Sequence, residues 1–190
     1  MTTTLIRNAE RIVTFDDTDR ELLDASIRLE DNRIVAIGPA EELAGPADVV
    51  IDARGHVLIP GLVNTHHHFY QTLTRNLPAG QDAELFDWLV AHYPLWARMD
   101  PQSLFDASQV AAAELMLSGC TTAADHTYLW PNGARIDDQI SPVTELGLRF
   151  HASRGSMSVG ESAGGPAAGP RGGEGGRHPR RHPARHRALP

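Results

Sequence analysis

The fold is decided by residues 57–68, which read VLIPGLVNTHHH. An apolar run with a Pro-Gly break leads into three consecutive histidines. Side chains in a strand alternate between two faces, so we expect His66 and His68 on one side and His67 on the other. Neutral imidazole is a good ligand for zinc and iron, and two imidazoles on one face therefore predict half of a metal site. The alternative is a polar strand end that happens to be rich in histidine.

Strand and helix patterns alternate after this stretch. The expected order is strand 57–65, helix 84–97, helix 100–117, strand 121–126, helix 141–147 and strand 148–153. Asp100-Pro101 marks the start of the second helix and Gly119 its end. Ser141-Pro142 marks the start of the third. Strands that alternate with helices predict an α/β fold with a parallel sheet and right-handed crossovers.

The first 56 residues alternate apolar and polar side chains instead. The expected strands are 5–8, 11–15, 25–30, 33–38 and 48–53. Asp31-Asn32 joins two of them as a hairpin turn. A small β-domain is therefore expected before the α/β part.

Composition points to a cytoplasmic protein without disulfides. The net charge is −7, and no charged-then-apolar leader or 18-residue apolar run occurs in the sequence. Cys120 is the single cysteine, so an internal disulfide framework is excluded, and its apolar surroundings favour a buried packing role. We therefore expect no membrane association.

Residues 163–190 differ sharply from the rest. They hold six arginines and one glutamate (+5), so residues 1–162 sum to −12, since −12 + 5 gives the net charge of −7. Glycine, proline, arginine and alanine dominate, and such a segment is expected to be disordered. A basic nucleic-acid arm or a histidine-rich metal tract (His178, His182 and His186) are two interpretations.

A third interpretation of this tail is a reading-frame shift. All 17 basic residues are arginine, which suggests a GC-rich gene, and glycine, proline, arginine and alanine are what such DNA encodes in a wrong frame. The codons for residues 166–185 permit an acidic helical sequence in the neighbouring frame. We expect the tail to be a frameshift product that truncates the chain.

Three motifs resemble the amidohydrolase superfamily. Residues 60–68 (PGLVNTHHH) are similar to its first-strand motif, and residues 119–128 (GCTTAADHTY) to the second-strand region of its aminohydrolase branch. Residues 149–158 (RFHASRGSMS) and 160–165 (GESAGG) are similar to the 8-oxoguanine deaminase group of that branch. The resemblance covers residues 1–165.

The resemblance implies a (β/α)8 metal-dependent hydrolase barrel preceded by a small β-sandwich domain. Residues 1–56 would form an incomplete β-sandwich part, residues 57–162 the first three β/α units, and residues 163–190 the tail. A full barrel takes about 250 residues, so the chain is expected to hold its N-terminal part.

The resemblance also implies a metal-dependent site. His66 and His68 match the two metal ligands of the first strand, with zinc the first choice of metal and iron the alternative. The family's remaining histidines and its catalytic aspartate lie on later strands and have no match here. We therefore expect no catalytic residue within this chain, which alone should be inactive.

Two residues match substrate-binding positions. Gln71 would hydrogen-bond the amide edge of a heterocycle, and the alternative is a solvated loop glutamine. Arg154 would hold a ring carbonyl at the barrel mouth, and the alternative is a surface ion pair.

Other polar and aromatic residues have two interpretations each. Asp125 and His126 close the second strand as groups that orient the site from behind, or serve in capping and hydrogen bonding. Trp88 and Trp96 either stack on a purine or, as helical spacing favours, belong to the core. His67 should face the barrel wall, and His92 and His151 should be structural.

The function that the resemblance implies is hydrolytic deamination of a purine-like small molecule, 8-oxoguanine to urate and ammonia. Pterin, guanine or triazine substrates are alternatives, because pocket residues decide among them. A catalytically inactive fragment is the competing interpretation, and a nucleic-acid binder is not expected. A homo-oligomer is compatible with the resemblance.

Overall fold

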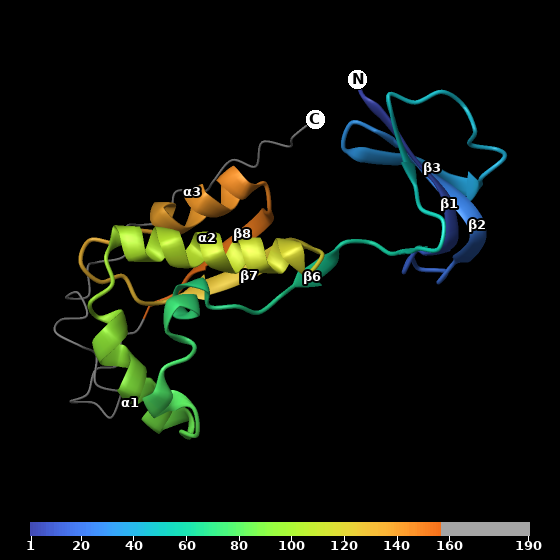
Figure 1. Cartoon of the computed structure of the whole chain (residues 1–190). Coiled ribbons are helices and arrows are strands. Elements are labelled where there is room, and N and C mark those ends of the chain that lie inside the picture. The colour runs from blue at the N-terminus through green and yellow to red at the C-terminus, as the bar shows by residue number, and fades with distance from the viewer. Residues whose placement is uncertain (157–190) are drawn as a thin grey trace. The chain divides into compact units, whose positions relative to one another are not determined.

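The computed structural model describes residues 1–156 and divides into two compact units. The first unit is Met1–Gly61 and the second begins at Leu62 (Figure 1). Each unit is described by itself. No helix within residues 1–156 is long and apolar enough to cross a membrane.

The first unit is one mixed sheet of five strands: β1 (Thr3–Val13), β2 (Glu21–Glu30), β3 (Arg33–Pro39), β4 (Val49–Asp52) and β5 (Val57–Leu58). The order is β3-β2-β1-β4, with β5 also paired to β1. The β1–β2 and β2–β3 pairs are antiparallel, whereas β4 and β5 run parallel to β1. Ala9, Ile12, Ala25 and Ala53 form its small core.

The hairpin expected at residues 25–38 is confirmed, but the two strands expected at 5–8 and 11–15 are one continuous strand, β1. The register of β1 shifts between Ile6 and Ala9, and Asn8 has a φ of 61°. Asparagine tolerates this left-handed conformation, so the strand bulges at Asn8 without ending. The first unit holds one sheet among residues 1–61, so no second sandwich layer is found there.

The strand expected at residues 57–65 is also corrected, because the structure divides it. Val57 and Leu58 pair with β1, while β6 (Leu62–Asn64) belongs to the second unit. Pro60 lacks a backbone N–H and interrupts strand pairing, which separates the two pieces. The boundary between units therefore falls after Gly61 rather than after residue 56.

The second unit builds a parallel sheet in the order β6-β7-β8, as expected for an α/β fold. Its other elements are η1 (Phe69–Thr74), η2 (Pro78–Gly80), α1 (Leu85–Trp96), α2 (Pro101–Leu117), β7 (Cys120–Thr127), α3 (Asp137–Leu146) and β8 (Arg149–Arg154). Helices α2 and α3 lie side by side along the sheet (Figure 1). One core joins them to it through the buried residues Phe69, Ala111, Ala112, Ala123, Val143 and Leu148.

Local signals explain most helix ends. The Asp100 side chain accepts a hydrogen bond from the Ser103 backbone N–H (2.8 Å) and caps α2, and Gly119 follows its end with a φ of 88°. Helix α3 is a correction, because it begins at Asp137 and contains Pro142 in its interior. The first turn of α3 includes Gln139, which is fully buried and hydrogen-bonded to Asp125. This buried contact extends the helix ahead of the proline.

Candidate functional site

The three consecutive histidines directly follow β6. Residues 65–68 have left the strand, yet the alternation expected of a strand persists. The rings of His66 and His68 meet edge to face with centroids 5.1 Å apart, while the His67 ring packs against Phe69 at 4.8 Å. The two candidate ligands therefore lie together and His67 turns away from them.

His68 is held in the tautomer that suits a metal ligand. Its Nδ1 lies 2.5 Å from the backbone oxygen of His126. A carbonyl oxygen only accepts, so Nδ1 carries the proton and Nε2 keeps its lone pair. Metal-bound histidines usually donate their other ring N–H in this way. The geometry of His66 and His68 thus fits two ligands of a divalent metal.

His67 is half-buried on the opposite side of the segment. Burial lowers the pKa of His67, and the charge of Asp125 opposes that shift. Its Nδ1 atom has no hydrogen-bond partner among residues 1–156. These features fit the expectation that His67 faces the barrel wall and not the metal.

No further ligand joins the pair in the described part of the chain. Residues 1–156 contain no group of three or more histidine, cysteine or acidic side chains able to hold a metal ion. The centroid of the His126 ring lies 5.8 Å from that of His68. The His126 ring packs closely against Gly155, where an added Cβ would lie 2.4 Å from His126 Nε2. Catalytic zinc usually has three protein ligands, so two histidines make a half-site.

Asp125 lies behind this half-site. Its side chain is 2% exposed, and its carboxylate accepts hydrogen bonds from the Phe69 backbone N–H, the Thr127 hydroxyl and the Gln139 amide. Burial raises the pKa of Asp125, and these hydrogen bonds oppose the rise. Asp125 contacts the residue next to His68 without reaching the imidazole pair itself.

Gln71 lies in η1, three residues after His68. Its backbone N–H donates to the His68 carbonyl (3.0 Å), and its side-chain amide donates to the Tyr70 hydroxyl (3.1 Å). Tyr70 is buried, and burial raises the pKa of its hydroxyl. The structure thus places Gln71 beside the histidines, with its amide nitrogen paired to a core tyrosine rather than only to solvent.

Arg154 is exposed at the carboxyl end of β8. Its guanidinium carbon lies 5.5 Å from the centroid of the Trp130 ring, and none of the ion pairs within residues 1–156 includes it. Sequence reasoning missed Trp130, whose indole N–H also donates to the Gly155 carbonyl (3.3 Å). Trp130 lies in the loop that follows β7, and this position at the carboxyl end of a strand could have indicated a role near the site.

Trp88 and Trp96 of α1 are core residues, as helical spacing favours, whereas Phe86 of the same helix is exposed. Trp96 is fully buried with Tyr70, Tyr93 and Leu104, and Trp88 packs against the same cluster. His92 is buried as expected, and its Nδ1 atom lies 2.8 Å from the Trp88 carbonyl. The His151 side chain, for which a structural role was expected, is exposed on β8.

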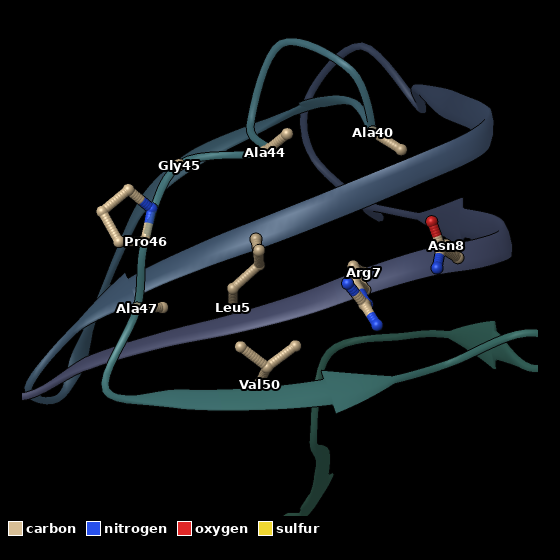
Figure 2. A pocket seen from close by; sticks show the side chains of 9 residues that line it. All are labelled: Leu5, Arg7, Asn8, Ala40, Ala44, Gly45, Pro46, Ala47 and Val50. Atoms are coloured by element: carbon tan, nitrogen blue, oxygen red, sulfur yellow. The ribbon is translucent and has the colours of Figure 1, made fainter.

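A hollow of about 340 Å³ lies in the first unit, beside β1 and β4 (Figure 2). Arg7 is its charged residue and Asn8 its other polar side chain, and alanine, glycine, proline, leucine and valine complete the lining. A second hollow on α3 is lined by Asp137, Ile140, Ser141, Thr144 and Glu145. Neither contains the histidine pair, and neither presents grouped metal ligands.

Comparisons with known proteins agree with the motifs. Residues 57–185 match the amidohydrolase family. The chain is 50% identical to 8-oxoguanine deaminase of Pseudomonas aeruginosa over 86% of this chain and 36% of that protein. It is 38% identical to isoxanthopterin deaminase of an unidentified prokaryote, over 80% of this chain and 33% of that protein.

A solved structure supports the fold. Atrazine chlorohydrolase TrzN from Arthrobacter aurescens TC1, crystallised with zinc, is 34% identical with a TM-score of 0.75, over 85% of this chain and 38% of that one. The chain therefore belongs to the amidohydrolase family. It spans about a third of the length of the curated relatives that it matches.

Proposed function

We propose that this chain is the N-terminal part of a metal-dependent hydrolytic deaminase that acts on 8-oxoguanine. Water and 8-oxoguanine would give urate and ammonia. The observation that carries the metal site is the paired arrangement of His66 and His68, with the His68 Nε2 atom left free by the bond from Nδ1 to the His126 carbonyl. The 50% identity to a deaminase of this substrate carries the substrate class.

We further propose that the parallel strands β6, β7 and β8 are the first three strands of a (β/α)8 barrel and that the first sheet is one layer of a β-sandwich. The carboxyl ends of barrel strands form the active-site face. His66 and His68 follow β6, His126 is near the end of β7 and Arg154 ends β8. The proposed site residues therefore come from corresponding ends of neighbouring parallel strands.

His66 and His68 would hold one divalent metal, with zinc the first choice because a family neighbour was crystallised with it. When bound, such an ion lowers the pKa of a water ligand and supplies hydroxide near neutral pH. Gln71 would accept or donate a hydrogen bond at the amide edge of the ring. Arg154, oriented by the face of Trp130, would donate hydrogen bonds to a ring carbonyl.

The competing candidate is a non-catalytic fragment. The observation that favours it is the two-histidine half-site, because residues 1–156 supply no third ligand. We expect the 190-residue chain to bind zinc weakly and to release no ammonia. Extending the chain in the neighbouring reading frame after residue 165 should restore activity.

The test compares both chains for ammonia release from 8-oxoguanine, isoxanthopterin and guanine, and for chloride release from a chlorotriazine, with zinc present. Release from 8-oxoguanine by the extended chain, lost in its His68→Ala variant, is the expected result. Faster release from another substrate would replace the proposed one. Activity of the soluble, monomeric 190-residue chain would overturn the proposal that it is inactive.

A further inference from the structure

Two consecutive residues of β7, Asp125 and His126, are hydrogen-bonded to three consecutive residues after β6. These three are His67, His68 and Phe69. The Phe69 backbone N–H donates to Asp125 Oδ1 (2.5 Å), and the His68 Nδ1–H donates to the His126 carbonyl (2.5 Å). The His126 backbone N–H donates in turn to the His67 carbonyl (3.0 Å). The segment that carries the candidate ligands is therefore tied to β7 at each of these three residues.

Of the side chains in these contacts, the Asp125 carboxylate is the one held in place by further side-chain hydrogen bonds. Its second oxygen, Oδ2, accepts from Thr127 Oγ1 (2.9 Å) and from Gln139 Nε2 (2.5 Å). Thr127 and Gln139 are both fully buried, and Gln139 comes from α3. An ionised carboxylate is acceptor-only, so three donors match its chemistry. With both oxygens engaged at 2% exposure, Asp125 has no face left for a metal or a substrate.

We propose that Asp125 is a positioning residue that presets the metal-binding pair of histidines. By holding the Phe69 amide it fixes the path of the chain directly after His68, so that the His68 Nδ1–H meets the His126 carbonyl and Nε2 points free. This inference rests on the proposed metal-dependent function. It assigns to Asp125 no contact with metal, substrate or reacting atoms.

Metal affinity should then depend on a side chain that does not touch the metal. Partners that orient a ligand from behind typically change metal affinity by about 10–100-fold when they are removed. We expect a loss of that size in Asp125→Ala. Asp125→Asn should recover most of the affinity, because one amide oxygen can still accept from Phe69. The Gln139 Oε1 atom, which has no partner among residues 1–156, can rotate to accept from the new amide nitrogen.

The experiment is a zinc titration of the whole 190-residue chain in competition with a chromophoric chelator. The variants are Asp125→Ala, Asp125→Asn, His68→Ala and Thr127→Val. Thr127→Val removes one donor to the carboxylate but leaves the Phe69 bond, so its affinity should stay close to that of the wild type. Circular dichroism verifies that each variant is folded. A folded Asp125→Ala chain that binds zinc as tightly as the wild type overturns the proposal.

A second readout separates this inference from the proposed function. In metal-free protein, amide hydrogen exchange reports the Phe69 N–H, and 15N NMR of the imidazole reports which His68 nitrogen carries the proton. We expect slow Phe69 exchange and a protonated Nδ1 in the wild type and in Asp125→Asn. Equal Phe69 exchange in wild type and Asp125→Ala overturns the positioning role. If Asp125→Ala does not fold, a folded Asp125→Asn chain in which the Phe69 amide exchanges fast while zinc binds as tightly as in the wild type overturns it instead.

Zinc binding that is as weak in the wild type as in His68→Ala would overturn the metal site alone, while slow Phe69 exchange would still support the positioning role.

Discussion

At the residue scale, the two candidate ligands differ in how firmly they are oriented. The His68 ring is tied by its own Nδ1 atom to the His126 carbonyl. The hydrogen bond at His66 comes from its backbone N–H to the Asn64 side chain (3.2 Å), so it does not orient the ring. Pre-orientation of His68 lowers the ordering cost of metal binding, because one side-chain geometry is already selected.

This difference gives a prediction for single substitutions. His66→Ala and His68→Ala should each reduce zinc affinity of the chain at least tenfold, because each removes one of two ligands. His56→Ala is the matched control, since His56 is an exposed histidine of the first unit. Isothermal titration with zinc measures all three. An equal loss in His56→Ala would mean that zinc binds scattered surface imidazoles.

The histidine pair, and Asp125 and His126 as candidate supports, could be named from the sequence, whereas the contacts between them could not. Alternation along an extended segment is a local property, so His66 and His68 were assigned to one side without any fold. The Asp125–Phe69 and His68–His126 contacts join residues 56 and 58 positions apart. No local pattern reports such a pair. The Arg154–Trp130 contact was missed for the same reason, because it needs the register of β7 and β8.

At the element scale, α1 is anchored to the segment that follows the histidines. The buried His92 ring packs against both the Trp88 and Trp96 rings, with centroids 4.2 and 5.1 Å away, and these two indoles also contact each other. Its Nε2 atom lies 3.3 Å from the Thr74 carbonyl, and the Trp96 indole N–H donates to Thr74 Oγ1 (2.9 Å). Thr74 therefore ties α1 to the end of η1.

The close packing of Gly80 in η2 against the Trp88 and His92 rings of α1 gives a second prediction. A Cβ at Gly80 would lie 2.6 Å from His92 Cε1 and 3.1 Å from Trp88 Cδ1. Both of these rings are packed against the Trp96 ring. Gly80→Ala should destabilise the second unit by about 1–3 kcal/mol through overpacking. Urea unfolding followed by tryptophan fluorescence measures it, since all three tryptophans lie after residue 61. Ala79→Ser, at the exposed neighbouring position, should leave the midpoint unchanged.

The cap of α2 gives a pH-dependent prediction. Hydrogen bonds from Ser103 lower the pKa of Asp100 below its ordinary 3.8. A lowered folded-state pKa means that the cap stabilises the fold above pH 3.8 and that this contribution is lost as the pH falls through the folded value. Asp100→Ala should therefore lower the thermal midpoint at pH 7, and this effect should shrink as the pH falls below 3.8. Asp82→Ala, in an exposed turn, should show no such pH-dependent difference.

Element boundaries show where local signals suffice. Asp100-Pro101 and Gly119 bound α2 as predicted, because capping depends on a few adjacent residues. The start of α3 and the continuity of β1 were mispredicted. Gln139 extends α3 through a contact with Asp125, and Asn8 bulges within a strand held by partners on both sides. In both cases a distant partner overrides the local signal.

At the scale of the whole molecule, the change of composition at residue 163 makes a prediction about the gene. The structure describes residues 1–156, so the tail lies outside the described residues. We expect resequencing through codons 155–190 to reveal a one-base discrepancy near codon 165, after which the acidic helical reading continues. An unchanged DNA sequence would contradict a sequencing error and would mean that the cell makes a half-barrel or that the gene is dead.

The central place of β1 in the first sheet has a consequence for synthesis on the ribosome. β1 leaves the exit tunnel before its partners, two of which are β4 and β5, and β5 ends at Leu58. The β2–β3 hairpin closes over a two-residue turn and can form early, whereas the parallel partners of β1 must wait for most of the unit to emerge. Pauses in translation before that point would prolong the exposure of an unpaired strand edge, which chaperones would then have to shield.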